Sequence, residues 1–175
     1  MSYPILTERL TIRPLAMVDL ETFVSYRQDP DIARFQGWES TYSKDQAIEL
    51  VKSQAGSVLP GKGDWLQLAI CSRVNEMHVG DLAIKSVAEQ DSTFELGFTI
   101  AKQHQGQGFA KEAATKLMSY LVLEAGAKKF IATTDSRNNA SIKVLSALGF
   151  KQDFSKGWTE TFKNELVNVD YFETP

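Results

Sequence analysis

Two glycines between a strand-like segment and a long helical segment mark the clearest candidate site in this chain. Gly106 and Gly108 belong to the run Gln-His-Gln-Gly-Gln-Gly-Phe-Ala at residues 103–110. Glycines let the backbone approach a ligand without an intervening Cβ atom, and a helix start adds unpaired N–H groups and the positive end of the helix dipole. The sequence therefore predicts an anion site at this turn, with phosphate or pyrophosphate as the expected ligand.

The segments on either side of the turn must position it. Residues 92–100 are rich in β-branched and aromatic side chains and are short enough for a strand. From 109 to 126 apolar residues recur every three or four positions, and Gly126 can end a helix in the left-handed conformation. The pattern is strand, glycine turn and helix. A tight turn that binds nothing would use glycines in the same way, so that alternative stays open for the turn alone.

Two other phosphate-binding patterns fit poorly. A dinucleotide-binding turn needs a third glycine where this chain has Lys111, and no acidic residue follows at the end of a second strand about 20 residues on. The segment 56–63 approaches a P-loop, but Gly63 stands where serine or threonine is required. That segment also follows a helical pattern and precedes a strand-like one, which is the reverse of the P-loop order. We expect it to be a surface loop.

A second candidate motif begins at Asn138. Apolar residues Ile142, Leu145 and Leu148 fall on one helical face, Asn138 can cap the helix, and Gly149 can end it before a strand that begins at Phe150. A capped amphipathic helix without a ligand would show the same features. The two motifs together are more informative than either one.

Gln-x-x-Gly-x-Gly at residues 103–108, followed by Asn138 and a short helix ending Leu-Gly-Phe, resembles the GNAT superfamily of acyl-coenzyme A-dependent N-acetyltransferases. In that family the turn binds the coenzyme A pyrophosphate, the pantetheine arm pairs with the preceding strand, and the asparagine contacts the pantetheine. The resemblance implies acetyl-coenzyme A as acyl donor. It implies these binding residues: Phe98, Thr99, Ile100, Gln103, Gln105, Gly106, Gln107, Gly108, Phe109, Ala110 and Asn138.

The chain departs from many GNAT enzymes at the proton donor. Many GNAT enzymes carry a tyrosine as general acid seven residues after the asparagine, and this chain has Leu145 at that position. Ser141 is the available hydroxyl and resembles the RimJ/RimL branch, which acetylates ribosomal-protein N-termini and whose serine is proposed to meet the departing thiolate. Segments 6–15 and 160–171 resemble the first strand and final hairpin of that branch, where a glutamate at the position of Glu160 is a proposed general base. Ser141 and Glu160 are therefore the candidate catalytic residues.

Acetyl transfer to an amine needs a neutral amine, a polarised carbonyl and a proton for the thiolate. Glu95 is a second candidate base, because strand alternation places it on the same face as Gly97 and Thr99. A carboxylate at that position could instead pair with a neighbouring strand, and we favour this interpretation. Ser141 could also act only as part of a helix cap.

Neither a covalent intermediate nor a metal is expected. Cys71 has no obvious partner and lies mid-strand, where a small core residue is the simpler interpretation. His78 and His104 lack the spacing of metal ligands, and we interpret each as a solvent or loop residue. Direct transfer within a ternary complex is the expected route.

The acceptor is where the sequence is least informative. By resemblance the acceptor pocket is built by residues 29–42 and 156–168, which contain Trp38 and Trp158, and both tryptophans fit a core role as well. The expected acceptor is a primary amine, either a protein N-terminus or a small molecule such as an antibiotic. Two other classes stay open: an acyl-coenzyme A sensor that does not depend on Ser141 or Glu160, and an enzyme that transfers a larger acyl group such as succinyl.

Composition fits one cytoplasmic α/β domain spanning residues 1–175. The chain has 43% hydrophobic residues, no run approaching 18 apolar residues and a net charge of −3 with interspersed signs, so we expect no membrane segment and no nucleic-acid partner. A homodimer stays open. The expected fold is α/β (α+β), the GNAT acyltransferase fold with a mixed, mostly antiparallel sheet flanked by helices. We predict helices at 19–28, 31–35, 44–55, 109–126 and 138–148, and strands at 10–15, 64–72, 79–85, 92–100, 129–134, 150–156 and 166–172.

Overall fold

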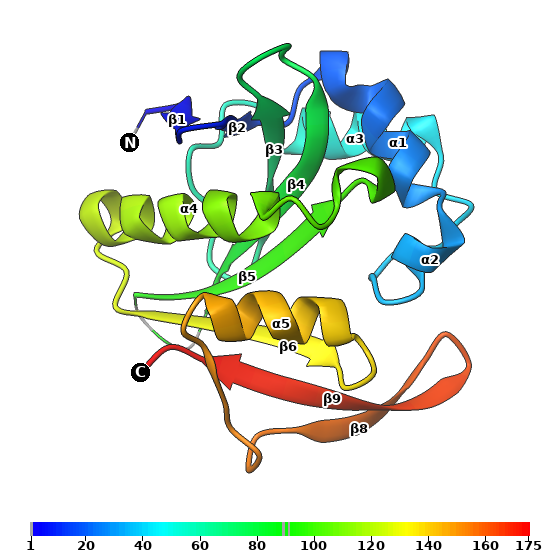
Figure 1. Ribbon diagram of the computed structural model, residues 1–175, viewed down its shortest axis with the longest axis vertical. Coiled ribbons are helices and arrows are strands. Elements are labelled where there is room, and N and C mark those ends of the chain that lie inside the picture. The colour runs from blue at the N-terminus through cyan, green and yellow to red at the C-terminus, as the bar shows by residue number, and fades with distance from the viewer. Residues whose placement is uncertain (1, 89, 91) are drawn as a thin grey trace.

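A nine-stranded sheet forms the centre of the computed structural model, which describes residues 2–88, 90 and 92–175 (Figure 1). The strand order is β1-β2-β3-β4-β5-β6-β9-β7, and β8 pairs with β9. Every pair is antiparallel except β5 with β6. The strands are β1 Ile5–Leu6, β2 Leu10–Pro14, β3 Trp65–Ser72, β4 His78–Ser86, β5 Thr93–Ile100, β6 Lys129–Asp135, β7 Lys151–Gln152, β8 Trp158–Phe162 and β9 Glu165–Glu173.

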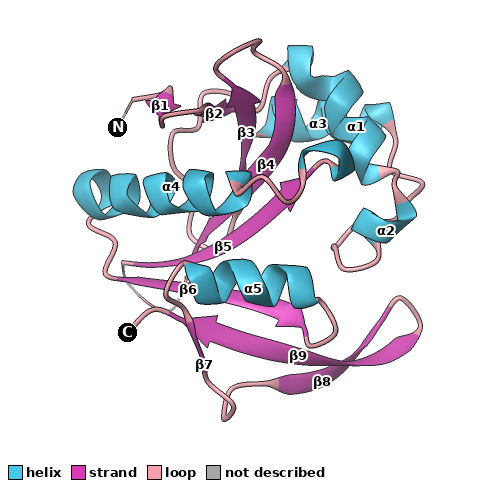
Figure 2. Cartoon of the chain, viewed as in Figure 1, coloured by secondary structure: helices cyan, strands magenta, loops and turns pink. Residues whose placement is uncertain are grey.

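Helices cover both faces of this sheet (Figure 2). The helices α4 and α5 lie over one face, whereas α1 and α3 pack on the opposite face. Two short 3-10 segments, η1 Met17–Asp19 and η2 Lys102–His104, precede α1 and α4. The expected mixed, mostly antiparallel sheet flanked by helices is confirmed. The helices are α1 Leu20–Arg27, α2 Pro30–Ala33, α3 Lys44–Ser53, α4 Phe109–Ala125 and α5 Asn139–Ala147.

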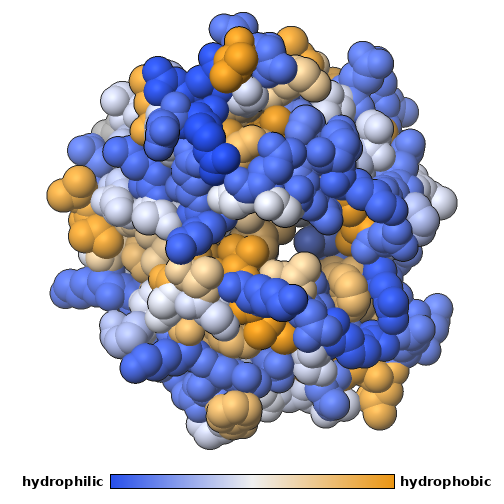
Figure 3. All heavy atoms as spheres, in the orientation of Figure 1, coloured by the Kyte–Doolittle hydropathy of each residue, from blue (hydrophilic) through white to orange (hydrophobic). Residues whose placement is uncertain are grey.

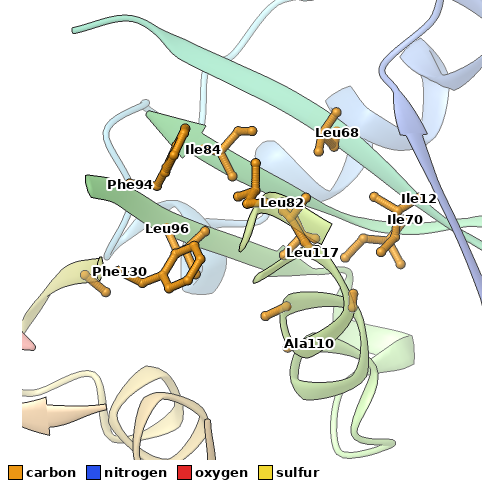
Figure 4. Close-up of a cluster of buried hydrophobic side chains, with 14 of the residues drawn as sticks. Ile12, Leu68, Ile70, Leu82, Ile84, Phe94, Leu96, Ala110, Leu117 and Phe130 are labelled. Carbon is orange, nitrogen blue, oxygen red and sulfur yellow. The ribbon is translucent and has the colours of Figure 1, made fainter. Parts of the chain in front are cut away.

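The main core lies between the strands and α4 (Figure 4). Alternating residues of β3 and β4, such as Leu68 and Leu82, are fully buried on the face that α4 covers with Leu117 and Leu121. Burying side chains of this size contributes about 1.5–3 kcal/mol each, so this packing holds the start of α4 firmly against the sheet. No helix in the described part of the chain is both long and apolar enough to cross a bilayer.

Local signals explain where the helices begin and end. Ser43 and Gln46 form a reciprocal capping box at the start of α3. Gly126 ends α4 in the left-handed conformation, with φ of +65°, and Gly149 follows α5 with φ of +87°. Asn138 caps α5, as the sequence predicted. Residues 56–63 contain no helix or regular strand, in agreement with the predicted loop.

The strand predicted at 150–156 is wrong beyond its first residues. It ends after β7, which contains only Lys151 and Gln152. Asp153 stops it, because its carboxylate accepts hydrogen bonds from the N–H and hydroxyl of Ser155 and its carbonyl accepts one from the Lys156 N–H. Such a local turn competes with strand pairing. The short strands β1 and β8 were not in the predicted set, although the expected final hairpin is present as β8 and β9.

The parallel strands β5 and β6 separate halfway along their length. They pair only from Thr93 with Lys129 to Glu95 with Ile131. Beyond Glu95 the edge of β5 that faces β6 has no strand partner within the described ladders, and β5 continues to Ile100. The separation leaves room for an extended ligand beside the end of β5.

An ion pair between Arg13 and Asp19 joins β2 to the start of α1, with guanidinium-to-carboxylate distances of 2.7 Å. Burial alone would raise the pKa of Asp19, but hydrogen bonds from Arg13 and the Ala16 N–H lower it below its ordinary value. We expect Asp19→Asn to lower the free energy of unfolding by about 2 kcal/mol at pH 7. A lowered folded pKa means that the stabilisation is complete above the unfolded pKa of about 3.9 and is lost as the pH falls through the folded value.

Urea unfolding of both proteins from pH 7 down to pH 3 measures this difference. Asp45→Asn, at an exposed carboxylate in the first turn of α3, is the control and should change stability little. A pH-independent difference for Asp19→Asn would contradict the assignment.

Candidate active site

The glycine turn has the backbone that an anion site requires. Gly106 and Gly108 have φ of +74° and +79°, in the left-handed region that favours glycine. Gly108 is the N-cap of α4, so the first N–H groups of this helix follow the turn directly. The Gln105 side chain donates to the Ile100 carbonyl at 2.9 Å, and the Gln107 side chain donates to the Gln103 carbonyl at 3.4 Å. These contacts hold the turn against the end of β5.

Arg9 braces the same turn from the other side, and sequence reasoning missed this role. Its guanidinium donates to the Gln107 carbonyl at 3.1 Å and to the Glu112 carboxylate at 2.7 Å, and it lies over the Phe109 ring at 4.7 Å. Thr7 also donates to Glu112. Arg9 belongs to the segment that resembles a family first strand, which was the available signal. These contacts within the chain hold the turn in shape.

A cavity of about 480 Å³ connects the end of β5, the glycine turn and the start of α5. Figure 3 shows the molecule hollowed between the N-terminal ends of α4 and α5, with hydrophobic atoms around the opening. Both sequence motifs therefore meet in one place, although about 30 residues separate them. The predicted site residues that line the cavity are Phe98, Thr99, Ile100, Gln105, Gly106, Gly108, Phe109, Ala110, Asn138 and Ser141.

Gln103, Gln107 and Glu160 do not line this cavity. The two glutamines still belong to the turn and contact each other through the hydrogen bond described above. The predicted acceptor segment 29–42 contributes part of the lining, and its lining residues are Asp31, Ile32, Phe35 and Gln36. Sequence reasoning did not select the other lining residues, which are Lys102 and His104 from η2, Lys111 from α4, and Ala140 and Val144 from α5.

Asn138 and Ser141 lie at the start of α5. The Asn138 side-chain oxygen accepts a hydrogen bond from the backbone N–H of Ser141 at 3.2 Å, which leaves the Ser141 hydroxyl outside the cap contact. Both side chains are partly buried at the cavity wall. Leu145, where many family members carry tyrosine, is 1% exposed and packs in the main core. The hydroxyl that the cavity receives from α5 is therefore that of Ser141.

Glu95 and Glu160 share a sheet face but have different surroundings. The register of β5, β6, β9 and β8 places both on the face opposite α4 and α5. Glu95 accepts a hydrogen bond from Thr133 at 3.3 Å and forms an ion pair with Lys85 at 3.6 Å. It therefore pairs with the neighbouring strands β6 and β4, which is the interpretation that we favour from the sequence. Glu160 is exposed in the hairpin, and its carboxylate accepts the Trp158 indole N–H at 3.0 Å.

The acceptor side of the cavity is formed by α2 and the loop that follows it. Lys102 of η2 pairs with Asp31 of α2 at 2.7 Å. Lys163, at the turn between β8 and β9, donates to the carbonyls of Ala33 and Trp38. Both lysines hold α2 in place, Lys102 from η2 before the glycine turn and Lys163 from the β8–β9 hairpin.

The two tryptophans differ. Trp38 is partly buried beside the smaller core, where its ring stacks on the Arg27 guanidinium at 3.7 Å and its N–H donates to the Arg27 carbonyl. Trp158 is 42% exposed on β8, so a core role is wrong for this residue. It lies on an edge strand that pairs only with β9, and too few neighbours surround it for burial.

The remaining titratable candidates do not form a nucleophile or a metal cluster. Cys71 is buried as expected, and burial raises the pKa of its thiol, which disfavours the reactive thiolate. The interpretation of His78 as a solvent or loop residue is wrong: it begins β4, is buried, and stacks against Phe23. No group of three or more potential metal ligands occurs among the residues that the structure describes.

Comparisons with known proteins agree with this geometry. The family model described as "Acetyltransferase (GNAT) domain" matches residues 9–151. The chain is similar to the uncharacterized N-acetyltransferase p20 of Bacillus licheniformis, with 25% identity over 166 residues that cover 95% of this chain and 92% of the relative.

Solved structures share the fold. A GNAT-family acetyltransferase from Bacillus anthracis has a TM-score of 0.83 and 21% identity, covering 98% of this chain and 97% of its own. Spermidine N-acetyltransferase from Vibrio cholerae, in complex with coenzyme A and spermine, has a TM-score of 0.80 and 18% identity over 95% of each chain. RimL, a ribosomal L7/L12 α-N-protein acetyltransferase in complex with coenzyme A, has a TM-score of 0.79 and 14% identity, over 98% of this chain and 97% of its own.

The family model covers most of the chain, and the solved GNAT-family acetyltransferase from Bacillus anthracis shares the fold. Members acylate amines with acetyl-coenzyme A as the acyl-donor substrate. The chain therefore belongs to the GNAT family and is an acyl-coenzyme A-dependent N-acetyltransferase.

Proposed function

We propose that this enzyme transfers acetyl from acetyl-coenzyme A directly to a primary amine within a ternary complex, as a single domain of the RimJ/RimL-like branch. One observation carries the proposal: the end of β5, the glycine turn and the start of α5 line a single cavity that also reaches α2. A donor held along β5 and an acceptor that enters beside α2 would meet at the gap between β5 and β6.

Each element has a distinct part in this proposal. The N–H groups at the start of α4 and the turn residues Gly106 and Gly108 would hold the pyrophosphate. The free edge of β5 from Phe98 to Ile100 offers main-chain groups to the pantetheine arm, and Asn138 lies across the gap. The Ser141 hydroxyl would then donate a proton to the thiolate as the acetyl group leaves.

The acceptor must lose a proton before it attacks. An N-terminal α-amine has a pKa of about 7.7–8.0, against about 10.4 for lysine, so an α-amine needs only modest help from a base. Glu160 lies outside the cavity lining and on the same sheet face as Thr99, and it would therefore act through water. A protein N-terminus is thus a proposed acceptor, supported by this modest demand on the base and by the RimJ/RimL-like segments of the sequence.

Replacing Glu160 tests the base. We expect Glu160→Gln to lower kcat/KM for the amine about 100-fold at pH 7, within the range of general-base contributions. The loss should shrink as the pH rises past the acceptor pKa of about 8, because the amine then loses its proton without help. Initial rates from pH 6 to pH 9.5 measure this. Glu165→Gln, in the same hairpin, is the matched control, and equal activity of the wild-type and Glu160→Gln enzymes at every pH would exclude the role.

The function itself is tested by acetyl-coenzyme A-dependent thiol release with N-terminal peptides, polyamines, amino acids and aminoglycosides. Calorimetry with acetyl-coenzyme A accompanies the panel. Turnover with any amine supports the proposal and identifies the acceptor class. Binding without turnover would favour an acyl-coenzyme A sensor, whereas faster release from succinyl-coenzyme A would show that a larger acyl group is the true donor.

A further inference from the structure

The carboxylates on the acceptor side of the cavity are already engaged with cations of the chain itself. Asp31 lines the cavity, and its carboxylate lies 2.7 Å from the Lys102 ammonium. The hydrogen bond from Lys102 holds the pKa of Asp31 below its ordinary value. Asp29, which caps α2 by accepting the Asp31 N–H, lies 3.9 Å from the same ammonium. Lys102 thus forms ion pairs with both carboxylates at the start of α2.

The loop after α2 shows the same pairing. Glu39 lies 3.6 Å from the ammonium of Lys163, which also donates to the carbonyls of Ala33 and Trp38. The Lys163 side chain is 21% exposed, so this cation is largely withdrawn from solvent.

Just after β6, Arg137 forms ion pairs with two carboxylates. It makes three hydrogen bonds to the Asp135 carboxylate and pairs with Glu165 of the hairpin at 3.0 Å. Glu95, farther back on the same sheet face, pairs with Lys85. Glu160 differs, because its carboxylate accepts a hydrogen bond from the neutral indole N–H of Trp158.

The cavity wall at α2 and the following loop includes two large apolar side chains. Ile32 and Phe35 line it from α2 and the loop after it. The described lining residues of the cavity include one carboxylate, Asp31, and two lysines, Lys102 and Lys111. Their charges sum to an excess of one positive charge. A second ammonium on an acceptor would meet no uncommitted carboxylate in this lining, and an unpaired charge is costly to desolvate.

We propose that the acceptor carries a single ammonium, the one that reacts, and presents an apolar substituent to Ile32 and Phe35; polyamines are poor substrates. The inference rests on the proposed acetyl transfer to an amine. It assigns Lys102 a role in specificity, because Lys102 pairs with the two carboxylates that would otherwise attract a second cation.

Matched amines test the inference directly. Hexylamine and 1,6-diaminohexane have the same chain length and differ in the second ammonium, and phenethylamine and spermidine extend the comparison. With saturating acetyl-coenzyme A, we expect kcat/KM for hexylamine to exceed that for 1,6-diaminohexane by at least tenfold. Equal or faster turnover of the diamine or of spermidine would overturn the inference while leaving the acetyltransferase activity in place. No release with any amine would remove the proposed function and the inference together.

Substitution of Lys102 distinguishes a change in acceptor specificity from a general loss of activity. Lys102→Met frees Asp29 and Asp31 from their cation, and we expect the hexylamine-to-diamine ratio of kcat/KM to fall about tenfold. Lys102→Arg keeps the charge and should retain the wild-type ratio. Lys52→Met removes a lysine that pairs with Glu49 on the exposed side of α3, away from the cavity, and is the control. An unchanged ratio in Lys102→Met would overturn the assignment, because a structural defect would slow both amines equally.

Discussion

Gly106→Glu is expected to weaken acetyl-coenzyme A binding at least 100-fold. Gly106 has φ of +74°, and a Cβ built on it meets no atom within 4 Å, so a side chain there would project from the open face of the turn. A carboxylate at that position would oppose the pyrophosphate, and two like charges 4 Å apart near a protein surface repel by about 4 kcal/mol. A 100-fold loss corresponds to about 2.8 kcal/mol, so the expected effect lies within this repulsion.

Gly126→Glu is the matched control for this experiment. Gly126 has φ of +65° and equally open surroundings, but it lies at the other end of α4. Both variants therefore carry the same backbone strain and the same added charge. Isothermal titration of acetyl-coenzyme A into each folded protein measures the difference, and unchanged affinity in Gly106→Glu would remove the pyrophosphate site from this turn.

Ser141→Ala is expected to lower kcat about 100-fold while changing acetyl-coenzyme A affinity less than about threefold. Loss of a general acid typically costs 10²–10⁴ in rate. The α5 cap is kept, because Asn138 accepts its hydrogen bond from the Ser141 backbone N–H and not from the hydroxyl. A fall in kcat with preserved binding would therefore report chemistry and not helix stability.

Single-turnover and steady-state thiol release measure this prediction. Ser146→Ala is the control, since Ser146 is an exposed serine of the same helix. Full activity of Ser141→Ala across the pH range would limit Ser141 to its place in the helix cap. Thiolate departure would then need no hydroxyl from α5.

The sequence by itself determined the parts of the site that depend on neighbours within a few residues. Left-handed glycines at 106 and 108, the Asn138 cap and the helix ends at Gly126 and Gly149 all follow from local backbone chemistry. Residues 150–156 show the limit of such reasoning, because the turn at Asp153 outweighed an apparently strand-like pattern. The family resemblance added the prediction that the glycine turn and Asn138 bind the same coenzyme A molecule.

Only the tertiary structure decided which distant side chains surround the turn. Arg9 reaches Glu112 and the Gln107 carbonyl from about 100 residues away, and Lys163 reaches Ala33 across 130 residues. It also decided the burial of His78 between aromatic rings and the hydrogen bond between Trp158 and Glu160. Periodicity in a chain reports which face a residue occupies, whereas strand order and register decide what stands opposite that face. The pairing of Asp29 and Asp31 with Lys102, and of Glu39 with Lys163, is a property of the folded chain alone.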